Sequence, residues 1–565
     1  MTVHEIINSE DFIDLRVEYT EEIDNMVKSS NDIFSFHNVA REYGILYIHK
    51  DRLASFLSQM TGRIKYDFPA PMGILDNLSL GESGIEYIHS QPYVQLRGLG
   101  VAIGIIDTGI DYTHPAFIKP NNTTKILRIW DQTIEGTPPT GLHFGHEYTS
   151  EDINRALQSS DPLSIVKQTD VIGHGTFLSG IAAGYDKTGT FKGVAPDADL
   201  IIVKVKPAKQ NLKDYWMILK EDALVYQSTD IMLGLRYVIQ IANLLQKPLV
   251  ATNSFGTSQG PHDGSGISSG SIEDISHRRG FAVVSAAGNE GIAGHHISGI
   301  VSEQTKTHDI ELKIGNNEKG CMIEIWIPAP DIMSVLVRSP LNEYVEMIPE
   351  RFISNETRQL LFEKTEITIE YDLANFRNGD QVIFIKLREP TPGIWTITLR
   401  SHVYLTGKFD AWLPLKTWIE EDTYFLDPDP NCTVTMPGSF SSVITVGAYD
   451  HRDGSLFIES GRGPSRIGYI RPDLVAPGVN IGAPGLMGDY ASFSGTSAAT
   501  AIVAGSAALL LEWGIVREKD PSMNTYKVRN YLIGGARREK NILYPNNIWG
   551  YGKLDLRGAF NMMRF

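Results

Sequence analysis

The sequence predicts an α/β protein whose parallel sheet is flanked by helices, with a small α+β region before the sheet and an all-β sandwich inserted into it. Three observations support this fold class. From Val101 onward, apolar strands alternate with amphipathic helices, which is typical of a parallel sheet covered on both faces. Between about residues 297 and 431 helical periodicity is nearly absent, and short strands follow one another between turns. Hydrophobic residues make up 42% of the chain and charged residues 21%, which is globular composition.

The first 85 residues predict a small N-terminal domain. Two strand-like runs, Phe12 to Tyr19 and Tyr43 to His49, precede a helix-compatible segment from Leu53 to Met60. A turn-rich stretch with prolines and glycines follows, which is typical of an exposed linker to a larger domain.

The central sheet is predicted from four apolar runs and the helices between them. The expected strands are Val101–Ile106, Leu200–Val205, Leu249–Ser254 and Phe281–Ala286, and the expected helices are Phe177–Ala183 and Ile231–Leu245. After the inserted region the α/β pattern resumes at Val443–Val446 and closes with a long helix from Ser497.

The inserted region is predicted from six strand-like runs, of which two show clear alternation of apolar and polar residues. They are Asp309–Ile314, Met322–Ile327, Ser334–Val337, Glu366–Glu370, Gln381–Leu387 and Trp395–Leu399. We therefore expect four parts: residues 1–85, residues 86–296, the insert at residues 297–432, and residues 433–565.

Bulk properties exclude several classes of function. The net charge of −16 disfavours nonspecific binding to nucleic acid or to an anionic membrane. Two cysteines, Cys321 and Cys432, in a chain of this length favour a reducing compartment. The N-terminus lacks the basic and apolar regions of a signal peptide, and the longest apolar run, Ala498 to Leu511, is too short to span a membrane. We expect an intracellular protein with no membrane span.

Three short motifs carry the expected chemistry. Asp107 ends the first apolar strand, His174 opens a helix, and Ser497 opens another. A serine hydroxyl needs a base to take its proton, and histidine suits this role because its pKa lies near neutrality. A carboxylate can hold the imidazole tautomer and stabilise the imidazolium. The N–H of Ser497 at a helix N-terminus and the side chain of Asn289 at a strand end are candidate donors to an oxyanion.

The order Asp-Thr-Gly, Gly-His-Gly-Thr, Ala-Gly-Asn and Gly-Thr-Ser resembles the subtilisin superfamily of serine endopeptidases. The resemblance implies that Asp107 orients, His174 acts as base, Ser497 is the nucleophile and Asn289 lines the oxyanion hole. It also implies that residues 254–256 and 286–288 bind substrate: Ser254, Phe255, Gly256, Ala286, Ala287 and Gly288. Ala116 replaces an acidic ligand of the family's strong calcium site, so we expect neither a metal nor a cofactor.

A narrower resemblance covers the whole chain. Residues 96–101, 111–117 and 495–505 are similar to the Csp germination proteases of clostridial spores. That family implies a spore-associated zymogen whose protein substrate is the precursor of a cortex-lytic hydrolase. It also implies a jelly-roll insert and an N-terminal prodomain, which acts as an intramolecular chaperone and is removed by self-cleavage between about Gly73 and Gln91.

Other interpretations stay open. A catalytically silent scaffold of the same group would lose triad residues, whereas all three are present, and an intracellular subtilisin of general protein turnover would share the chemistry. Each motif alone is typical of a turn or a capped helix. The pair His295-His296, with His262, has no ligand spacing and is read as a polar loop rather than a metal site.

Overall fold

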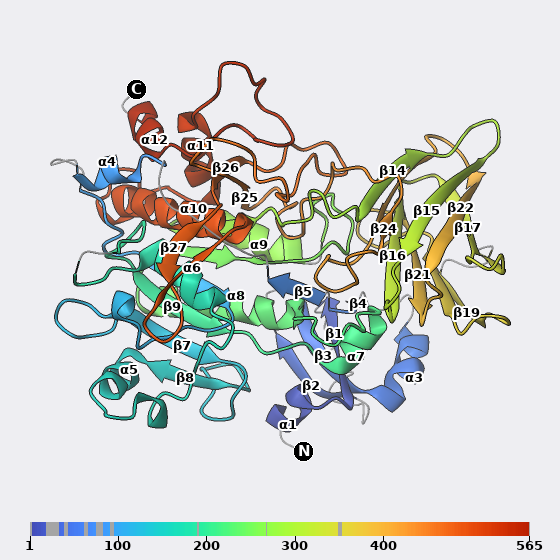
Figure 1. Cartoon of the computed structure of the whole chain (residues 1–565). Coiled ribbons are helices and arrows are strands. Elements are labelled where there is room, and N and C mark those ends of the chain that lie inside the picture. Colours follow the sequence, from blue (N-terminus) through green and yellow to red (C-terminus); the bar gives the residue numbers. More distant parts are fainter. Residues whose placement is uncertain are drawn as a thin grey trace.

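The computed structural model describes residues 3–18, 33–38, 43–60, 66–69, 71–74, 83–90, 95–188, 191–266, 268–347 and 353–563. An eight-stranded sheet lies at its centre, with helices on both faces, and an all-β region lies at one side (Figure 1). The N-terminal region packs beside the helices of one face.

The central sheet has the strand order β26-β25-β13-β11-β6-β9-β7-β8, and every neighbouring pair is parallel except β7 with β8. Its strands are β6 (Ala102–Asp107), β7 (Ile126–Asp131), β8 (His146–Thr149), β9 (Asp199–Lys204), β11 (Leu249–Asn253), β13 (Phe281–Ala286), β25 (Ile444–Tyr449) and β26 (Leu474–Pro477). The mixed, mainly parallel sheet with its helices confirms the predicted α/β class.

Alternate residues of each central strand enter two different cores. In β6, Ile103 and Ile105 pack with the helices of one face, whereas Ala102 and Ile106 pack with those of the other. This burial on both faces explains why the strands read as continuous apolar runs. The first face carries α4 (Ile85–Ser90), α5 (Ser150–Leu157), α6 (His174–Ala183), α10 (Thr496–Leu511), α11 (Thr525–Gly535) and α12 (Leu556–Met562), and the second carries α8 (Ser228–Leu244) and α9 (Ser268–Ser276).

The helix that begins with α10 is longer than the sequence suggested. It continues as a π-helical turn, so that residues Thr496–Val516 form a 21-residue segment, within which an 18-residue window has a mean hydropathy of 1.7. Its length and composition would allow a membrane span, but every residue of α10 is buried between the sheet and α6. The segment is long enough to span a membrane, and its apolar character is explained by its burial in the core of the protein.

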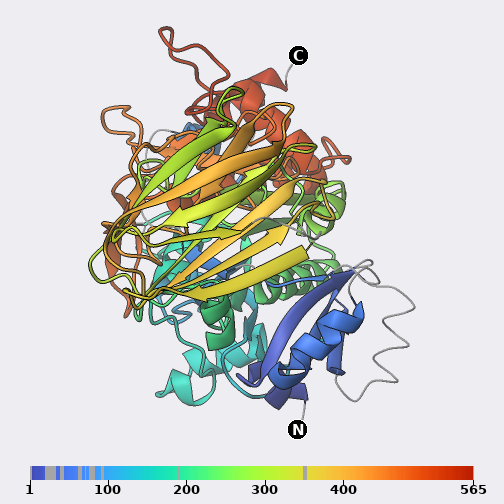
Figure 2. The same ribbon diagram turned by 90° about the vertical axis from the view of Figure 1, so that its right-hand side faces the viewer.

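The all-β region consists of two antiparallel sheets. One has the order β14-β23-β16-β21-β20-β19 and the other β18-β17-β22-β15-β24, and apolar side chains from both sheets form one core around Trp395. Figure 2 shows these strands crossing one side of the molecule. The bounds are β14 (His296–Ile300), β15 (Thr307–Ile314), β16 (Gly320–Ile327), β17 (Ile332–Arg338), β18 (Tyr344–Met347), β19 (Ile353–Gln359), β20 (Glu366–Asp372), β21 (Gln381–Arg388), β22 (Gly393–Val403), β23 (Lys408–Trp412) and β24 (Tyr424–Phe425).

The N-terminal region forms its own antiparallel sheet in the order β2-β3-β1-β4. Its elements are α1 (Val3–Asn8), β1 (Phe12–Glu18), β2 (Ile33–Asn38), β3 (Tyr43–His49), α3 (Lys50–Met60) and β4 (Tyr66–Asp67). The sheet packs next to α8 and α7 (Gln210–Tyr215), where the buried Asp14 carboxylate accepts a 2.5 Å hydrogen bond from the Lys209 ammonium. The remaining short strands are β5 (Pro71–Ile74), β10 (Tyr226–Gln227), β12 (Phe255–Gly256), β27 (Ile481–Pro484) and β28 (Tyr490–Phe493).

Candidate active site

The residue expected to orient the base and the residue expected to act as the base are in direct contact. Asp107 ends β6 and His174 begins α6, and the His174 Nδ1 atom lies 2.7 Å from Asp107 Oδ1. Because a carboxylate only accepts, Nδ1 carries a proton and Nε2 is left to act on a substrate-side group. Asp107 Oδ1 also accepts the Thr108 N–H at 2.8 Å, and both side chains are buried.

Close packing of two glycines allows this contact. A Cβ atom on Gly175 would lie 2.2 Å from the carbonyl oxygen of Gly109 and 3.2 Å from Cβ of Asp107. Any side chain at position 175 would therefore separate the two motifs. Gly175 therefore allows the His174 and Asp107 motifs to pack closely.

Asp170 organises the loop that leads into α6, and we missed it in the sequence. One of its oxygens accepts hydrogen bonds from Thr108 Oγ1 (2.9 Å) and the Gly173 N–H (2.8 Å), and the other accepts from the N–H and the hydroxyl of Thr176. The buried Asp170 carboxylate thus caps α6 and ties the His174 motif to the Asp107 motif. An acidic residue four positions before a helix-opening histidine is the signal that could have revealed it.

Ser497 is the second residue of α10 and is fully buried. Within the part of the chain that the structure describes, its hydroxyl makes no hydrogen bond. His174 also lies at a helix N-terminus, and its helix α6 packs against α10. Catalytic hydrogen bonds often form only when substrate binds, so this geometry is compatible with a nucleophile and its base.

Asn289 lies next to the start of α10. Its Oδ1 atom accepts hydrogen bonds from the N–H and the hydroxyl of Thr496, both at 3.1 Å. This pair of contacts fixes which end of the amide is the oxygen, and it directs the Nδ2 donor away from Thr496. The amide therefore lies beside Thr496, the residue before Ser497, with a defined orientation.

The residues expected to bind substrate divide between two segments. Phe255 and Gly256 form β12, and the fully buried Phe255 ring packs on Tyr226 at 4.8 Å, so only the backbone of this strand is available to a ligand. Ser254, which precedes β12, is buried. Burial raises the pKa of the Tyr226 phenol well above its usual range, and the charges of Asp107 and Asp170 add to this shift.

The second segment, Ala286–Gly288, begins at the last residue of β13 and is buried. The Ala287 carbonyl accepts the Thr435 N–H at 2.9 Å, and a Cβ on Gly288 would lie 2.6 Å from Thr435 Oγ1. These alanines and this glycine pack closely against residues that return from the all-β region.

The chain itself covers the strand that is expected to bind substrate. Strand β5, from the N-terminal region, lies between β10 and β12 and is antiparallel to both. Gly73 pairs with Gly256, and Ile74 pairs with Phe255. This arrangement is that of an extended peptide added to the edge of a binding strand.

The model of the subtilase family matches residues 98–315 and 426–552, which is more than half of the chain. The chain belongs to the subtilase family. The interruption of the match, residues 316–425, contains strands β16 to β24 of the two antiparallel sheets, whereas β14 and β15 lie within the matched residues.

Known subtilases resemble the chain over different lengths. The structure of the CspB protease of Clostridium perfringens is 33% identical, with a TM-score of 0.75, over 85% of this chain and 98% of that one. Serine protease AprX of Bacillus subtilis is 34% identical over 22% of this chain and 31% of its own length. The minor extracellular protease Vpr of the same organism is 22% identical over 82% of this chain and 51% of its own length. The match to CspB confirms the predicted similarity to the Csp proteases.

Proposed function

We propose that this subtilase is a serine endopeptidase acting through Asp107, His174 and Ser497, and that it is a spore germination protease. The observation that carries the catalytic part is the buried 2.7 Å contact between His174 and Asp107, in a fold where Ser497 stands at the start of a neighbouring helix. The similarity to CspB over 98% of that chain supports the germination part.

In the proposed reaction the Ser497 hydroxyl attacks the scissile carbonyl while His174 Nε2 takes its proton. Asp107 keeps the imidazole in the Nδ1–H tautomer and stabilises the imidazolium that forms. The Ser497 N–H and the Asn289 Nδ2 group stabilise the oxyanion of the tetrahedral intermediate. His174 then protonates the leaving amine, and water hydrolyses the acyl-enzyme. These are the roles that the triad has in subtilisin.

We infer that residues 1–85 are a prodomain. Strand β5 occupies the edge of β12, where a peptide substrate would pair, so the N-terminal region blocks the site through which substrates would enter. The expected self-cleavage range, from about Gly73 to Gln91, includes residues 75–82 and 91, which lie outside the described residues, and residues 73–74 and 83–90, which the structure describes. The inserted region would be a jelly roll, as in the Csp family, and the protein would reside in the spore.

The proposed substrate is the precursor of a cortex-lytic hydrolase, which limited proteolysis would activate. Limited proteolysis requires that the site stays closed until the enzyme is needed, and β5 occupies the edge of β12 for as long as the N-terminal region remains in place. The two antiparallel sheets beside the subtilase domain offer a further surface on which such a substrate could be selected.

The test compares the untagged wild type with Ser497→Ala. The wild type should lose its N-terminal region on a denaturing gel and should react with a fluorophosphonate probe, whereas the variant should do neither. A folded wild type that stays intact and unlabelled would exclude the protease. Incubation with a cortex-hydrolase precursor and with casein then separates the roles: one discrete cut in the precursor supports the germination role, and broad casein digestion without that cut contradicts it.

A further inference from the structure

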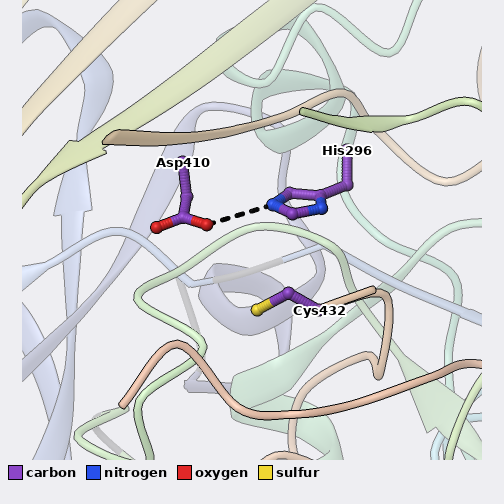
Figure 3. Close-up of side chains that lie close together, drawn as sticks. All are labelled: His296, Asp410 and Cys432. Carbon is purple, nitrogen blue, oxygen red and sulfur yellow. Dashed lines mark hydrogen bonds and ion pairs between the residues drawn. The ribbon is translucent and has the colours of Figure 1, made fainter. Parts of the chain in front are cut away.

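Three residues with metal-binding side chains meet at the base of the all-β region, far from one another in sequence. The donor atoms of His296, Asp410 and Cys432 all lie within 4.8 Å of one another. Figure 3 shows the His296 ring facing the Asp410 carboxylate, with the Cys432 side chain beneath them. We propose that these three residues form a zinc site that fastens the all-β region to the subtilase domain.

The hydrogen bonds of His296 prepare it as a ligand. Its Nδ1 atom lies 3.1 Å from the backbone carbonyl of Asp429, and because a carbonyl only accepts, Nδ1 carries a proton. Metal-binding histidines are commonly held in this way by a carbonyl behind the ring. Nε2 then points at Asp410 Oδ1, at 3.2 Å. Two acceptor atoms at this distance repel each other unless a cation, either a proton or a metal ion, lies between them.

The distances suit a tetrahedral zinc ion. With bonds of about 2.0 Å to nitrogen and oxygen and about 2.3 Å to sulfur, tetrahedral donors lie about 3.3 to 3.6 Å apart. The His296–Asp410 distance of 3.2 Å is close to this value, and the sulfur lies within 4.8 Å of both other donor atoms. A shift of about 1 Å would therefore bring three donors to tetrahedral positions, and a water molecule would supply the fourth ligand. Thiolate, imidazole and carboxylate together favour zinc over calcium or magnesium, which prefer oxygen ligands alone.

The neighbouring residues restrain two of the ligands. The Trp412 ring stacks on His296 with centroids 4.7 Å apart, and its Nε1–H donates a 3.1 Å hydrogen bond to the carbonyl of Cys432. His296 and Cys432 are both buried, and the thiol is not part of a disulfide. The positive charge of Arg466 acts on the Cys432 thiol. Ion pairs with the carboxylates of Asp263 and Asp380 balance this charge.

The three ligands come from three segments that define the base of the region. His296 begins β14, Asp410 lies on the paired strand β23, and Cys432 lies on the segment that returns to the subtilase domain. A metal ion here would join the entering strand, its neighbour and the exit segment. The ion would therefore stabilise the attachment of the all-β region to the subtilase domain. It would take no part in the chemistry of Asp107, His174 and Ser497.

The experiment uses the full chain without a histidine tag, as Ser497→Ala to prevent self-cleavage. This protein and a second one that also carries Cys432→Ser are dialysed against zinc and then against buffer, and bound zinc is measured by mass spectrometry. The matched control is Cys321→Ala, because Cys321 is also buried but lies in the core between the two antiparallel sheets. We expect about one zinc ion per chain in the parent and the control, and an affinity at least about 100-fold weaker in the Cys432→Ser protein.

A second readout covers the case in which the Cys432 variant fails to fold. Cobalt added to the parent protein should give a thiolate-to-cobalt absorption band and the visible bands of a tetrahedral ion, and Asp410→Asn should shift the visible bands. Zinc should also raise the melting temperature of the parent and of the Cys321→Ala protein. A parent protein that keeps no zinc and shows no thiolate band would overturn the proposal, leaving a proton shared by His296 and Asp410. Equal zinc binding by the folded Cys432→Ser protein would overturn it as well.

Discussion

Asn289 and Thr496 are joined by two hydrogen bonds, both accepted by Asn289 Oδ1 at 3.1 Å. The contact connects the end of β13 to the first turn of α10. It therefore sets the position of the Asn289 amide relative to Ser497, the next residue along the helix. A donor that is fixed before the reaction begins stabilises developing charge without further rearrangement.

Replacing Asn289 by alanine removes this donor. We expect kcat for a peptide substrate to fall about 10²–10³-fold, the size known for one oxyanion donor of subtilisin, with little change in KM. Steady-state kinetics with a chromogenic peptide measure both constants. Thr496→Val is the companion variant, since it removes the hydroxyl that contacts Asn289 and should cause a smaller loss of kcat. An Asn289→Ala enzyme with unchanged kcat would contradict the assigned role.

Replacing Asp107 by asparagine changes the charge that faces His174 and leaves the shape of the side chain unaltered. The amide can present a donor to Nδ1 and so favour the wrong imidazole tautomer. We expect kcat to fall by about 10⁴-fold and labelling by a fluorophosphonate to slow in parallel. Thermal unfolding of the same variant on the Ser497→Ala background shows whether the fold is retained. Activity within tenfold of the wild type would mean that Asp107 does not orient the base.

Replacing Asp170 by alanine leaves its hydrogen-bond donors in Thr108, Gly173 and Thr176 without their buried acceptor. Unsatisfied buried donors cost about 1–3 kcal/mol each, so we expect a clear drop in melting temperature together with a large loss of kcat. Asp170→Asn keeps one acceptor oxygen and should be intermediate in both. The control is Asp161→Ala, an exposed position earlier in the same loop, which should change neither property.

The parts of the fold that the sequence revealed are those in which local pattern and burial agree. Strands β6, β9, β11 and β13 are buried on both faces, so their apolar runs were visible. Strand β8 lies at the sheet edge with the residues His146-Glu-Tyr-Thr149, and no apolar pattern marks it. Helix α10 was visible for the same reason as the buried strands, because all its residues lie in the core.

The site divides in a similar way. Asp107, His174, Asn289 and Ser497 stand in short motifs that can be recognised without any knowledge of their neighbours. The function of Asp170 depends on donors that come together only in the folded loop. The cluster around Cys432 could not be found from spacing, because its ligands come from three segments that the two antiparallel sheets bring together.

Glu324, on strand β16, lies at the contact between the all-β region and the loop around Gly260. Its Oε1 atom accepts hydrogen bonds from the Gly260 N–H at 2.9 Å and from Trp326 Nε1 at 2.7 Å. Among the described residues, the other oxygen has no hydrogen-bond partner. Burial raises the pKa of this carboxyl from 4.5 to about 7, although both hydrogen bonds and the charge of Arg466 act in the opposite direction.

The sign of the pH effect follows from this raised pKa. Well below pH 4.5 the carboxyl is protonated in the folded and the unfolded chain, so it does not affect the free energy of unfolding. Between pH 4.5 and about 7 the unfolded chain releases this proton while the folded chain still holds it, so the free energy of unfolding falls as pH rises. Above about pH 7 the folded chain is ionised as well, and the loss is complete. Glu324→Gln resembles the protonated form. On the Ser497→Ala background we expect it to stabilise the protein by on the order of 3 kcal/mol at pH 8, and by progressively less toward pH 5. Denaturant unfolding at several pH values measures this difference, with the exposed Glu311→Gln as control. A stability difference that does not change with pH would show that Glu324 is already ionised across the range.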